Sequence, residues 1–120
     1  YCYDETAKES QRERELAAAD KLFGILPDDQ AVYMRGLWDE FEEGDTPEAR
    51  FARTMDRIQP TLLNRSSGGI SWLEHGIAVS QVLRRNSISG AGSEVLWNYA
   101  KENFLRPAVE DGQLKGDVNF

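Results

Sequence analysis

The chain has 120 residues, enough for one domain with a hydrophobic core, and its 40% hydrophobic content favours a globular fold over disorder. A formal net charge of −7 argues against a nucleic-acid polymer as partner, because phosphate binding needs a basic surface. Cys2 is the single cysteine, which excludes an internal disulfide framework and predicts a cytoplasmic location. No apolar run approaches the roughly 18 residues of a membrane span, so no membrane association is expected.

Two amphipathic helices are predicted in the first third of the chain. After an extended stretch over residues 1–5, Asp4 or Thr6 can cap a helix that reaches Leu26. The second helix is expected over residues 30–43, with Gly44 as its C-terminal stop. Spacings of three and four define the faces that should pack: Leu16, Ala19, Phe23 and Leu26 in the first helix, and Met34, Leu37, Trp38 and Phe41 in the second.

Four carboxylates gather near the end of the second predicted helix: Asp39, Glu40, Glu42 and Glu43. The C-terminal end of a helix disfavours negative charge, so some mild strain is expected there. Blocks of like charge usually form a solvated surface, and that is our interpretation of this cluster.

The third predicted helix covers residues 46–63. Thr46 can cap its N-terminus and Pro47 suits the first helical position. Helical spacing assigns four residues to its buried face: Ala49, Ala52, Met55 and Leu62.

Asp56 lies on this predicted apolar face, four residues after Ala52. An unpaired buried charge is expensive, so we expect the carboxylate to be paired, protonated or bound to a cation. An ion pair with Arg53, Arg57 or an arginine of a neighbouring helix is the structural alternative to a ligand role. Pro60 has no N–H for the carbonyl of Asp56, so the helix should kink or loosen just past the acid.

The second half of the chain predicts further helices separated by two loops, residues 64–69 and 87–92. One helical face between the loops comprises Trp72, His75, Val79, Val82 and Leu83. Ser93 should cap the last helix, which Pro107 interrupts, and residues 113–120 are either docked or disordered. The pattern predicts an all-α fold, a single helical bundle of about five helices.

Other chemical motifs are weak. One cysteine and one histidine cannot build a zinc site, and His75 is interpreted as a packed residue of the core. The loop over residues 90–94 precedes a helix but lacks the lysine and spacing of a phosphate-binding loop. Asp56 therefore remains the candidate for chemistry.

The order of several motifs resembles the C-terminal part of the HD-domain metal-dependent phosphohydrolases, especially the 5′-deoxynucleotidase-like branch. These motifs are Glu15-x-x-Ala18, Leu22, Leu26-Pro27, LWDEFEEG over residues 37–44, Thr46-x-Glu48-Ala49, Met55-Asp56-Arg57 and Trp72. The resemblance covers most of the chain. It implies that Asp56 is a ligand of a divalent metal ion, that the substrate is a small nucleotide, and that phosphate is released from nucleoside 5′-monophosphates.

The resemblance also implies that the domain is N-terminally incomplete. The His-Asp pair that names the family is absent here: His75 is followed by Gly76 and lies after Asp56. The sequence begins with Tyr1 rather than Met, so we expect it to be one part of a longer protein and inactive alone. A homodimer or association with the missing N-terminal segment should cover the apolar face that such a part leaves open.

A non-catalytic helical interaction domain, or a degenerate relative, is the alternative function. Under it, Asp56 would sit in an ion pair and exposed apolar residues would form a partner interface. A direct bond from Asp56 to an arginine, with no open space beside it, would favour this alternative.

Overall fold

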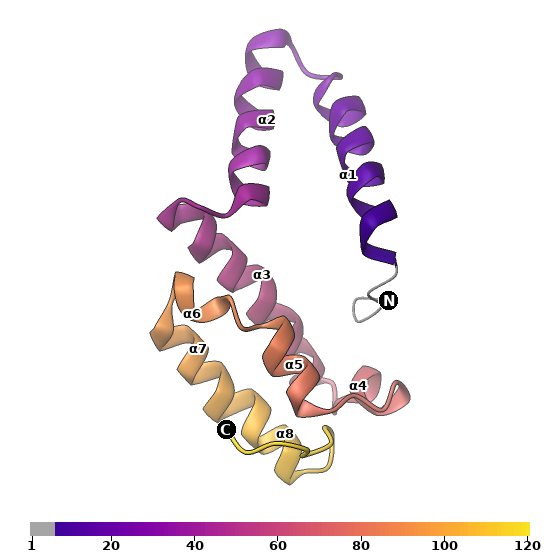
Figure 1. The fold of residues 1–120 in the computed structure, drawn as a ribbon, viewed down its shortest axis with the longest axis vertical. Coiled ribbons are helices and arrows are strands. Elements are labelled where there is room, and N and C mark those ends of the chain that lie inside the picture. Colours follow the sequence, from indigo (N-terminus) through magenta and orange to yellow (C-terminus); the bar gives the residue numbers. More distant parts are fainter. Residues whose placement is uncertain (1–6) are drawn as a thin grey trace. The chain divides into compact units, whose positions relative to one another are not determined.

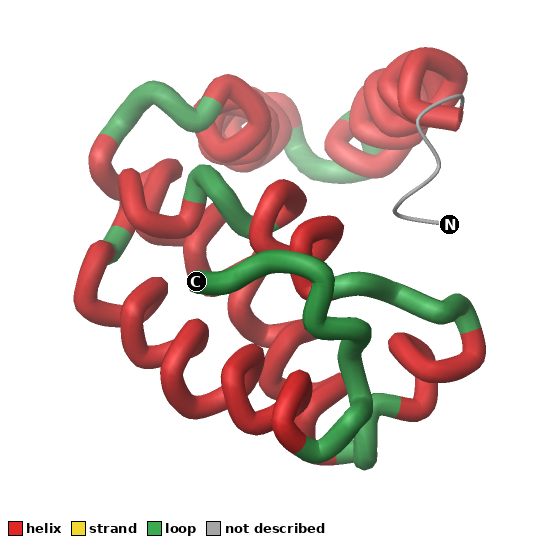
Figure 2. Tube along the Cα trace, turned by 60° about the horizontal axis from the view of Figure 1, so that its bottom comes forward, coloured by secondary structure: helices red, strands yellow, loops and turns green. Residues whose placement is uncertain are grey.

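The computed structural model describes residues 7–120, and the chain divides into two compact units, Tyr1–Glu43 and Gly44–Phe120. Helices make up the regular structure of the described part, without a strand, so the predicted all-α class is confirmed (Figures 1 and 2). None of the described helices combines the length and the apolar character that crossing a membrane requires.

The first unit is a hairpin of helices α1 (Lys8–Phe23) and α2 (Asp28–Glu43). The α1 cap predicted at Asp4 or Thr6 and the extended start of the chain lie outside the described residues. Trp38 of α2 packs against Phe23 of α1, with ring centroids 6.4 Å apart. Gly44 follows the last residue of α2 and ends the helix as predicted. Its φ of +71° lies in the left-handed region, which glycine adopts easily.

The second unit is built on α3 (Pro47–Ser66), against which the short helix α6 (Ser89–Gly92) packs. The sequence predicted a loop over residues 87–92, and this prediction is wrong because residues 89–92 form helix α6. Ser89 is fully buried against α3, and glycine at position 92 allows the two backbones to approach closely. The sequence pattern hides this helix because four residues are too few to show a periodicity.

The helix expected between the two predicted loops is in fact two helices, α4 (Ile70–Glu74) and α5 (Val79–Arg85). Gly76 separates them with a φ of +58°, a conformation that side-chain-bearing residues rarely adopt. Ile77 then turns into the core, where it is buried. The predicted single helix was wrong because the chain uses this glycine as a break and not as a tolerated helical residue.

The last helix runs through α7 (Glu94–Ala100), the π-helix η2 (Lys101–Leu105) and α8 (Arg106–Glu110). Ser93 caps it as predicted, since its side chain accepts a 3.2 Å hydrogen bond from the Leu96 N–H. The wider π turn ends two residues before Pro107, which cannot donate to the carbonyl four residues before it. The helix therefore changes its hydrogen-bond pattern at the proline instead of stopping.

The C-terminal segment, residues 113–120, is docked on the second unit (Figure 2). Leu114 is buried, and Ala78 and Lys115 form an isolated parallel bridge. Asp117 then accepts hydrogen bonds from the Ser80 N–H (3.0 Å) and hydroxyl (2.5 Å), in the first turn of α5. One carboxylate from a distant segment thus serves as a cap for α5, whose own N-cap, Ala78, has no oxygen in its side chain.

We expect this docking to weaken in acid. The hydrogen bonds from Ser80 hold the pKa of Asp117 below its usual range. A carboxyl group whose pKa is lower in the folded state contributes stability that is present above the unfolded pKa of about 4 and is lost as the pH falls through the folded value. The difference in urea midpoint between the wild type and Asp117→Asn should therefore shrink between pH 6 and pH 2. An unchanged difference would contradict this role.

Candidate functional site

Asp56 lies on α3, and the local sequence explains why this helix forms. The Thr46 side chain accepts a 3.2 Å hydrogen bond from the Ala49 N–H, and Pro47 occupies the first turn, as predicted. Pro60 lies inside the helix, which continues to Ser66. The Asn64 amide donates to the Pro60 carbonyl at 2.9 Å, so side-chain bonding supports the segment past the proline.

The buried side of α3 differs from the side that the sequence pattern predicts. Four residues are buried there: Ala49, Thr54, Ile58 and Thr61. Ala49 was predicted correctly, but Ala52 is exposed, Met55 is 45% exposed and Leu62 is 41% exposed. Asp56 is exposed with them, so the expectation that its carboxylate is buried in this chain is wrong. Its charge is hydrated and needs no internal partner.

Within the described part of the chain, the Asp56 carboxylate has no hydrogen bond or ion pair. The alternative of an ion pair with Arg53, Arg57 or an arginine of a neighbouring helix is therefore not realised among the described residues. A carboxylate oxygen is a ligand that hard divalent cations accept, and this one is available.

The described residues do not complete a metal site around it. Among residues 7–120, no group of three or more His, Cys, Asp or Glu side chains is placed to hold a metal ion. A protein site for a divalent ion draws several ligands to one point. Asp56 fits the role of one ligand, and the remaining ligands would have to come from elsewhere.

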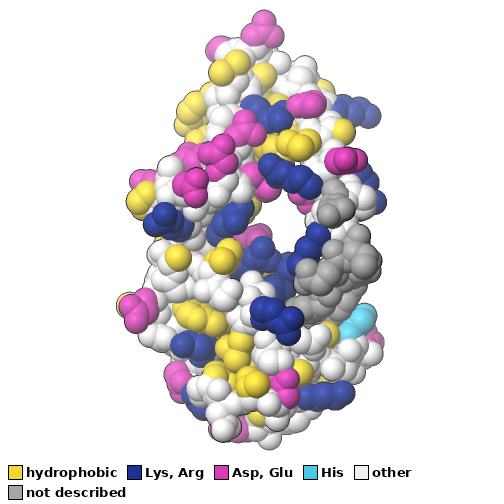
Figure 3. Space-filling model, in the orientation of Figure 1, with side chains coloured by type: hydrophobic (Ala, Val, Ile, Leu, Met, Phe, Trp, Pro, Cys, Tyr) yellow, Lys and Arg dark blue, Asp and Glu magenta, His cyan; other side chains and the backbone are white. Residues whose placement is uncertain are grey.

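The acidic cluster of α2 is engaged within its own hairpin, and acidic side chains are prominent over this helix (Figure 3). Arg35 bonds Asp20 at 2.5 Å and Asp39 at 3.1 Å, while Arg12 bonds Glu42 at 2.6 Å. The hydrogen bond to Asp20 raises the pKa of Arg35 most, and the hydrogen bond to Asp39 raises it further. The sequence predicted a solvated surface for this cluster, and the structure adds that Asp39 and Glu42 are ion-paired within the hairpin.

Trp38 contacts both arginines of this surface. The guanidinium carbons of Arg12 and Arg35 lie 5.6 and 5.2 Å from its ring centroid, within cation–π range. The same arginines therefore hold both the ring and the carboxylates, which explains how the hairpin tolerates acid at the C-terminal end of α2.

His75 is exposed at the end of α4, so its predicted place in the core is wrong. Its Nδ1 lies 2.9 Å from the Ser71 carbonyl, a local contact within the helix end. The break at Gly76 explains the error, because His75 and Val79 no longer share one helical face. Residues 90–94 end α6 and start α7, and the Ser93 side chain is used as the cap of α7.

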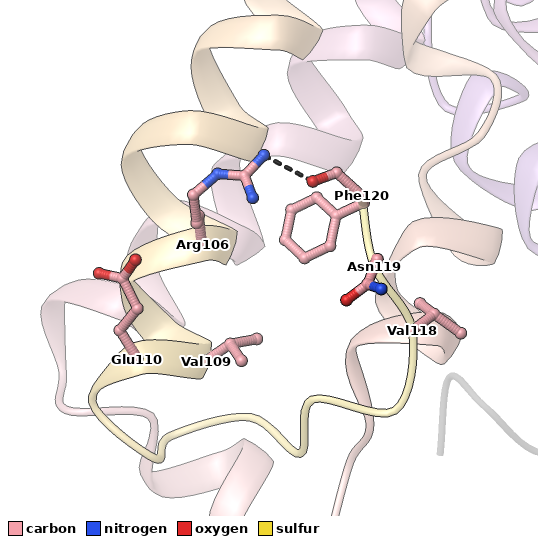
Figure 4. Close-up of a pocket in the computed structure, with 6 residues that line it drawn as sticks. All are labelled: Arg106, Val109, Glu110, Val118, Asn119 and Phe120. Carbon is pink, nitrogen blue, oxygen red and sulfur yellow. Dashed lines mark hydrogen bonds between the residues drawn. The ribbon is translucent and has the colours of Figure 1, made fainter.

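A cavity of about 240 Å³ lies beside the C-terminal segment, between α8 and residues 118–120 (Figure 4). Arg106 on its wall binds both oxygens of Glu102, at 2.8 and 3.0 Å, and also donates to the Phe120 carbonyl. The hydrogen bonds from Arg106 lower the pKa of Glu102. The Arg106 guanidinium is therefore engaged with protein acceptors, and Glu110 is the other charged side chain that lines the cavity.

Sequence reasoning missed Thr54 and Gly92, which join α3 to α6. A Cβ at Gly92 would lie only 2.2 Å from both the Arg50 carbonyl oxygen and Thr54 Oγ1. The Thr54 hydroxyl bonds the Ser89 carbonyl at 2.8 Å. Neither residue forms part of a motif, and only the three-dimensional contact makes them visible.

Comparison with known proteins agrees with the resemblance found in the sequence. The pattern of the HD domain matches residues 1–97. The 5'-deoxynucleotidase HDDC2 of Xenopus laevis is 36% identical over 59 residues, which are 49% of this chain and 29% of that protein. A crystal structure of a predicted metal-dependent phosphohydrolase from Magnetospirillum magnetotacticum MS-1 superposes with a TM-score of 0.82 and 42% identity, over 92% of this chain and 55% of that one. The chain thus spans only part of either protein, and it belongs to the HD-domain family.

Proposed function

We propose that this chain is part of a metal-dependent phosphohydrolase that releases phosphate from nucleoside 5′-monophosphates. The observation that carries the proposal is the exposed Asp56 carboxylate, which has no partner among the described residues. An exposed carboxylate oxygen is a ligand that suits a divalent cation. The similar proteins support the reaction class, since one is a 5'-deoxynucleotidase and another a predicted metal-dependent phosphohydrolase.

We propose further that residues outside this chain supply the other metal ligands. They would come from the N-terminal segment that the family resemblance implies or from a second subunit. Exposed apolar side chains on α3 support such an association, because Phe51, Met55 and Leu63 are 49%, 45% and 58% exposed. The cytoplasmic location expected from the single cysteine stays a prediction.

Phosphate release from the full-length protein tests this function. Deoxy- and ribonucleoside 5′-monophosphates would be incubated with Mn²⁺, Co²⁺ or Mg²⁺, and with EDTA as the metal-free control. We expect release with at least one metal ion and none in EDTA, whereas the 120-residue chain alone should give no appreciable release. Full activity in EDTA would contradict the metal requirement. No release under any condition would favour the non-catalytic interaction domain.

A further inference from the structure

In the hairpin of the first unit, α2 faces α1 with a largely polar side (Figure 1). Arg35 bonds Asp20 of α1, and Glu42 bonds Arg12 of α1. The ring of Trp38 packs against α1 as well. Residues 35, 38 and 42 follow helical spacings of three and four, so they mark the side of α2 that contacts α1.

An apolar side of α2 is left open. Tyr33, Met34 and Leu37 are 67%, 43% and 44% exposed, and we call these three residues the outer stripe of α2. Tyr33 and Leu37 each lie two residues from Arg35, a rotation of about 200° around the helix, so they are on nearly the opposite side from Arg35. All residues of α2 are described, and none of them is buried. The outer stripe therefore stays exposed although the hairpin is formed.

The outer stripe has the pattern of a packing surface. Tyr33 and Leu37 are four residues apart and Met34 lies three before Leu37, so their side chains form one continuous row. A helix of a globular protein carries such a row where it packs against another element. Because removing apolar surface from water stabilises a fold, we expect the stripe to be covered in the complete protein.

The charge of α2 argues against a second copy of this helix as the cover. The helix carries six carboxylates and one arginine, and Asp29 lies four residues before Tyr33, beside the stripe. Two copies packed stripe to stripe would place these acidic helices against each other, and like charges across a contact disfavour association. A covering helix with Lys or Arg beside its apolar side chains would be attracted instead.

The similar crystal structure has additional chain that could supply such a helix. The present chain superposes over 92% of its own length but covers only 55% of that protein. The helices described here thus occur in a longer relative, in which further chain is available to pack on them.

We propose that the outer stripe of α2 is the docking surface for a basic amphipathic helix of the N-terminal segment that precedes this chain in the full-length protein. The apolar side chains of that helix contact Tyr33, Met34 and Leu37, and its Lys or Arg side chains lie toward Asp29. The inference rests on the proposed function only in taking this chain as part of a longer protein. It involves no metal ion.

Photo-cross-linking from position 33 tests this docking in the full-length protein. Tyr33 is replaced by the photoreactive residue p-benzoylphenylalanine, which keeps an aromatic ring at this position. Val32, which is 76% exposed and lies outside the outer stripe, is replaced in the same way as the matched control. Mass spectrometry of the digested protein then identifies the cross-linked peptide. We expect position 33 to cross-link to a peptide that precedes Tyr1, and position 32 to give no such product.

The other cross-linking results would each overturn the proposal. A product of twice the protein mass would identify a second copy as the cover. A cross-link from position 33 to residues 44–120 would show that the cover lies within this chain. The absence of a cross-link would show that the outer stripe stays open to solvent.

Leu37→Ala in the full-length protein provides a second, independent measurement. If the outer stripe is buried there, this substitution should lower the melting temperature by roughly 5–10 °C, whereas Val32→Ala should change it by about 2 °C or less. Equal melting temperatures of the two variants would contradict the docking.

Neither measurement involves metal or substrate, so failure of the docking and failure of the proposed function are distinguishable. Metal-dependent phosphate release without the expected cross-link would overturn the docking alone. The expected cross-link without phosphate release would support the docking and overturn the proposed function.

Discussion

Replacing Asp56 by alanine in the full-length protein should remove Mn²⁺ binding and lower the rate of phosphate release by roughly 10³-fold or more. A metal ion contributes several kcal/mol to transition-state stabilisation in such reactions, and each 1.36 kcal/mol is a factor of ten in rate. Folding should be little affected, because the side chain is exposed and alanine is a better helix former than aspartate. Calorimetry with Mn²⁺, phosphate release and urea denaturation would measure the three effects.

Glu48→Ala is the matched control for this experiment. Glu48 is another exposed carboxylate of α3, located in its first turn, where it stabilises the helix dipole. Its removal should cost about 0.3–1 kcal/mol of stability and leave Mn²⁺ affinity intact. Asp56→Ala is thus expected to lose Mn²⁺ binding and keep its stability, whereas Glu48→Ala should keep Mn²⁺ binding and lose some stability. Retained activity in Asp56→Ala would rule out Asp56 as a ligand.

Gly92→Ala is expected to destabilise the second unit by about 3 kcal/mol, the upper part of the range for overpacked sites. The added methyl group would lie 2.2 Å from a backbone oxygen and 2.6 Å from the carbonyl carbon of Arg50. Backbone atoms cannot rotate away as a flexible side chain can, so α6 would have to shift as a whole. Urea denaturation followed by circular dichroism would measure the loss.

Gly90→Ala in the same short helix provides the comparison. The nearest atom to an added Cβ there is Trp97 Cδ1 at 3.5 Å, an ordinary van der Waals contact. We expect a change between zero and a stabilisation of about 0.5 kcal/mol, because alanine restricts the unfolded chain more than glycine does. Equal stabilities of the Gly90 and Gly92 variants would show that α6 does not pack as described.

Local chemistry made several helix boundaries predictable from the sequence. Thr46 and Ser93 act as caps, and Gly44 ends α2, because each of these roles depends on a few neighbouring backbone atoms. The all-α class was predictable as well, because helical periodicity is also a local property of the sequence. The choice of Asp56 as the candidate residue rested on a predicted apolar face that is exposed in this structure, so its ligand role stays a prediction.

The buried side of α3 was not predictable in the same way. Hydropathy favours Met55 over Thr54 as a core residue, yet Thr54 is fully buried and Met55 is 45% exposed. The threonine is accepted in the interior because its hydroxyl finds the Ser89 carbonyl, a partner 35 positions along the chain. A long-range partner of this kind leaves no trace in local spacing. The same limit hid the role of Gly76 as a helix break.

The docking of the C-terminal segment makes the start of α5 depend on it. The Val79 N–H donates to the Lys115 carbonyl at 2.8 Å, and the Lys115 N–H donates to the Ile77 carbonyl at 3.1 Å. Both amides lose their partners in the same event when the segment detaches, although they lie far apart in sequence. Their exchange with solvent deuterium is therefore governed by a single opening equilibrium, and the C-terminal segment and the first turn of α5 form one cooperative unit of local unfolding.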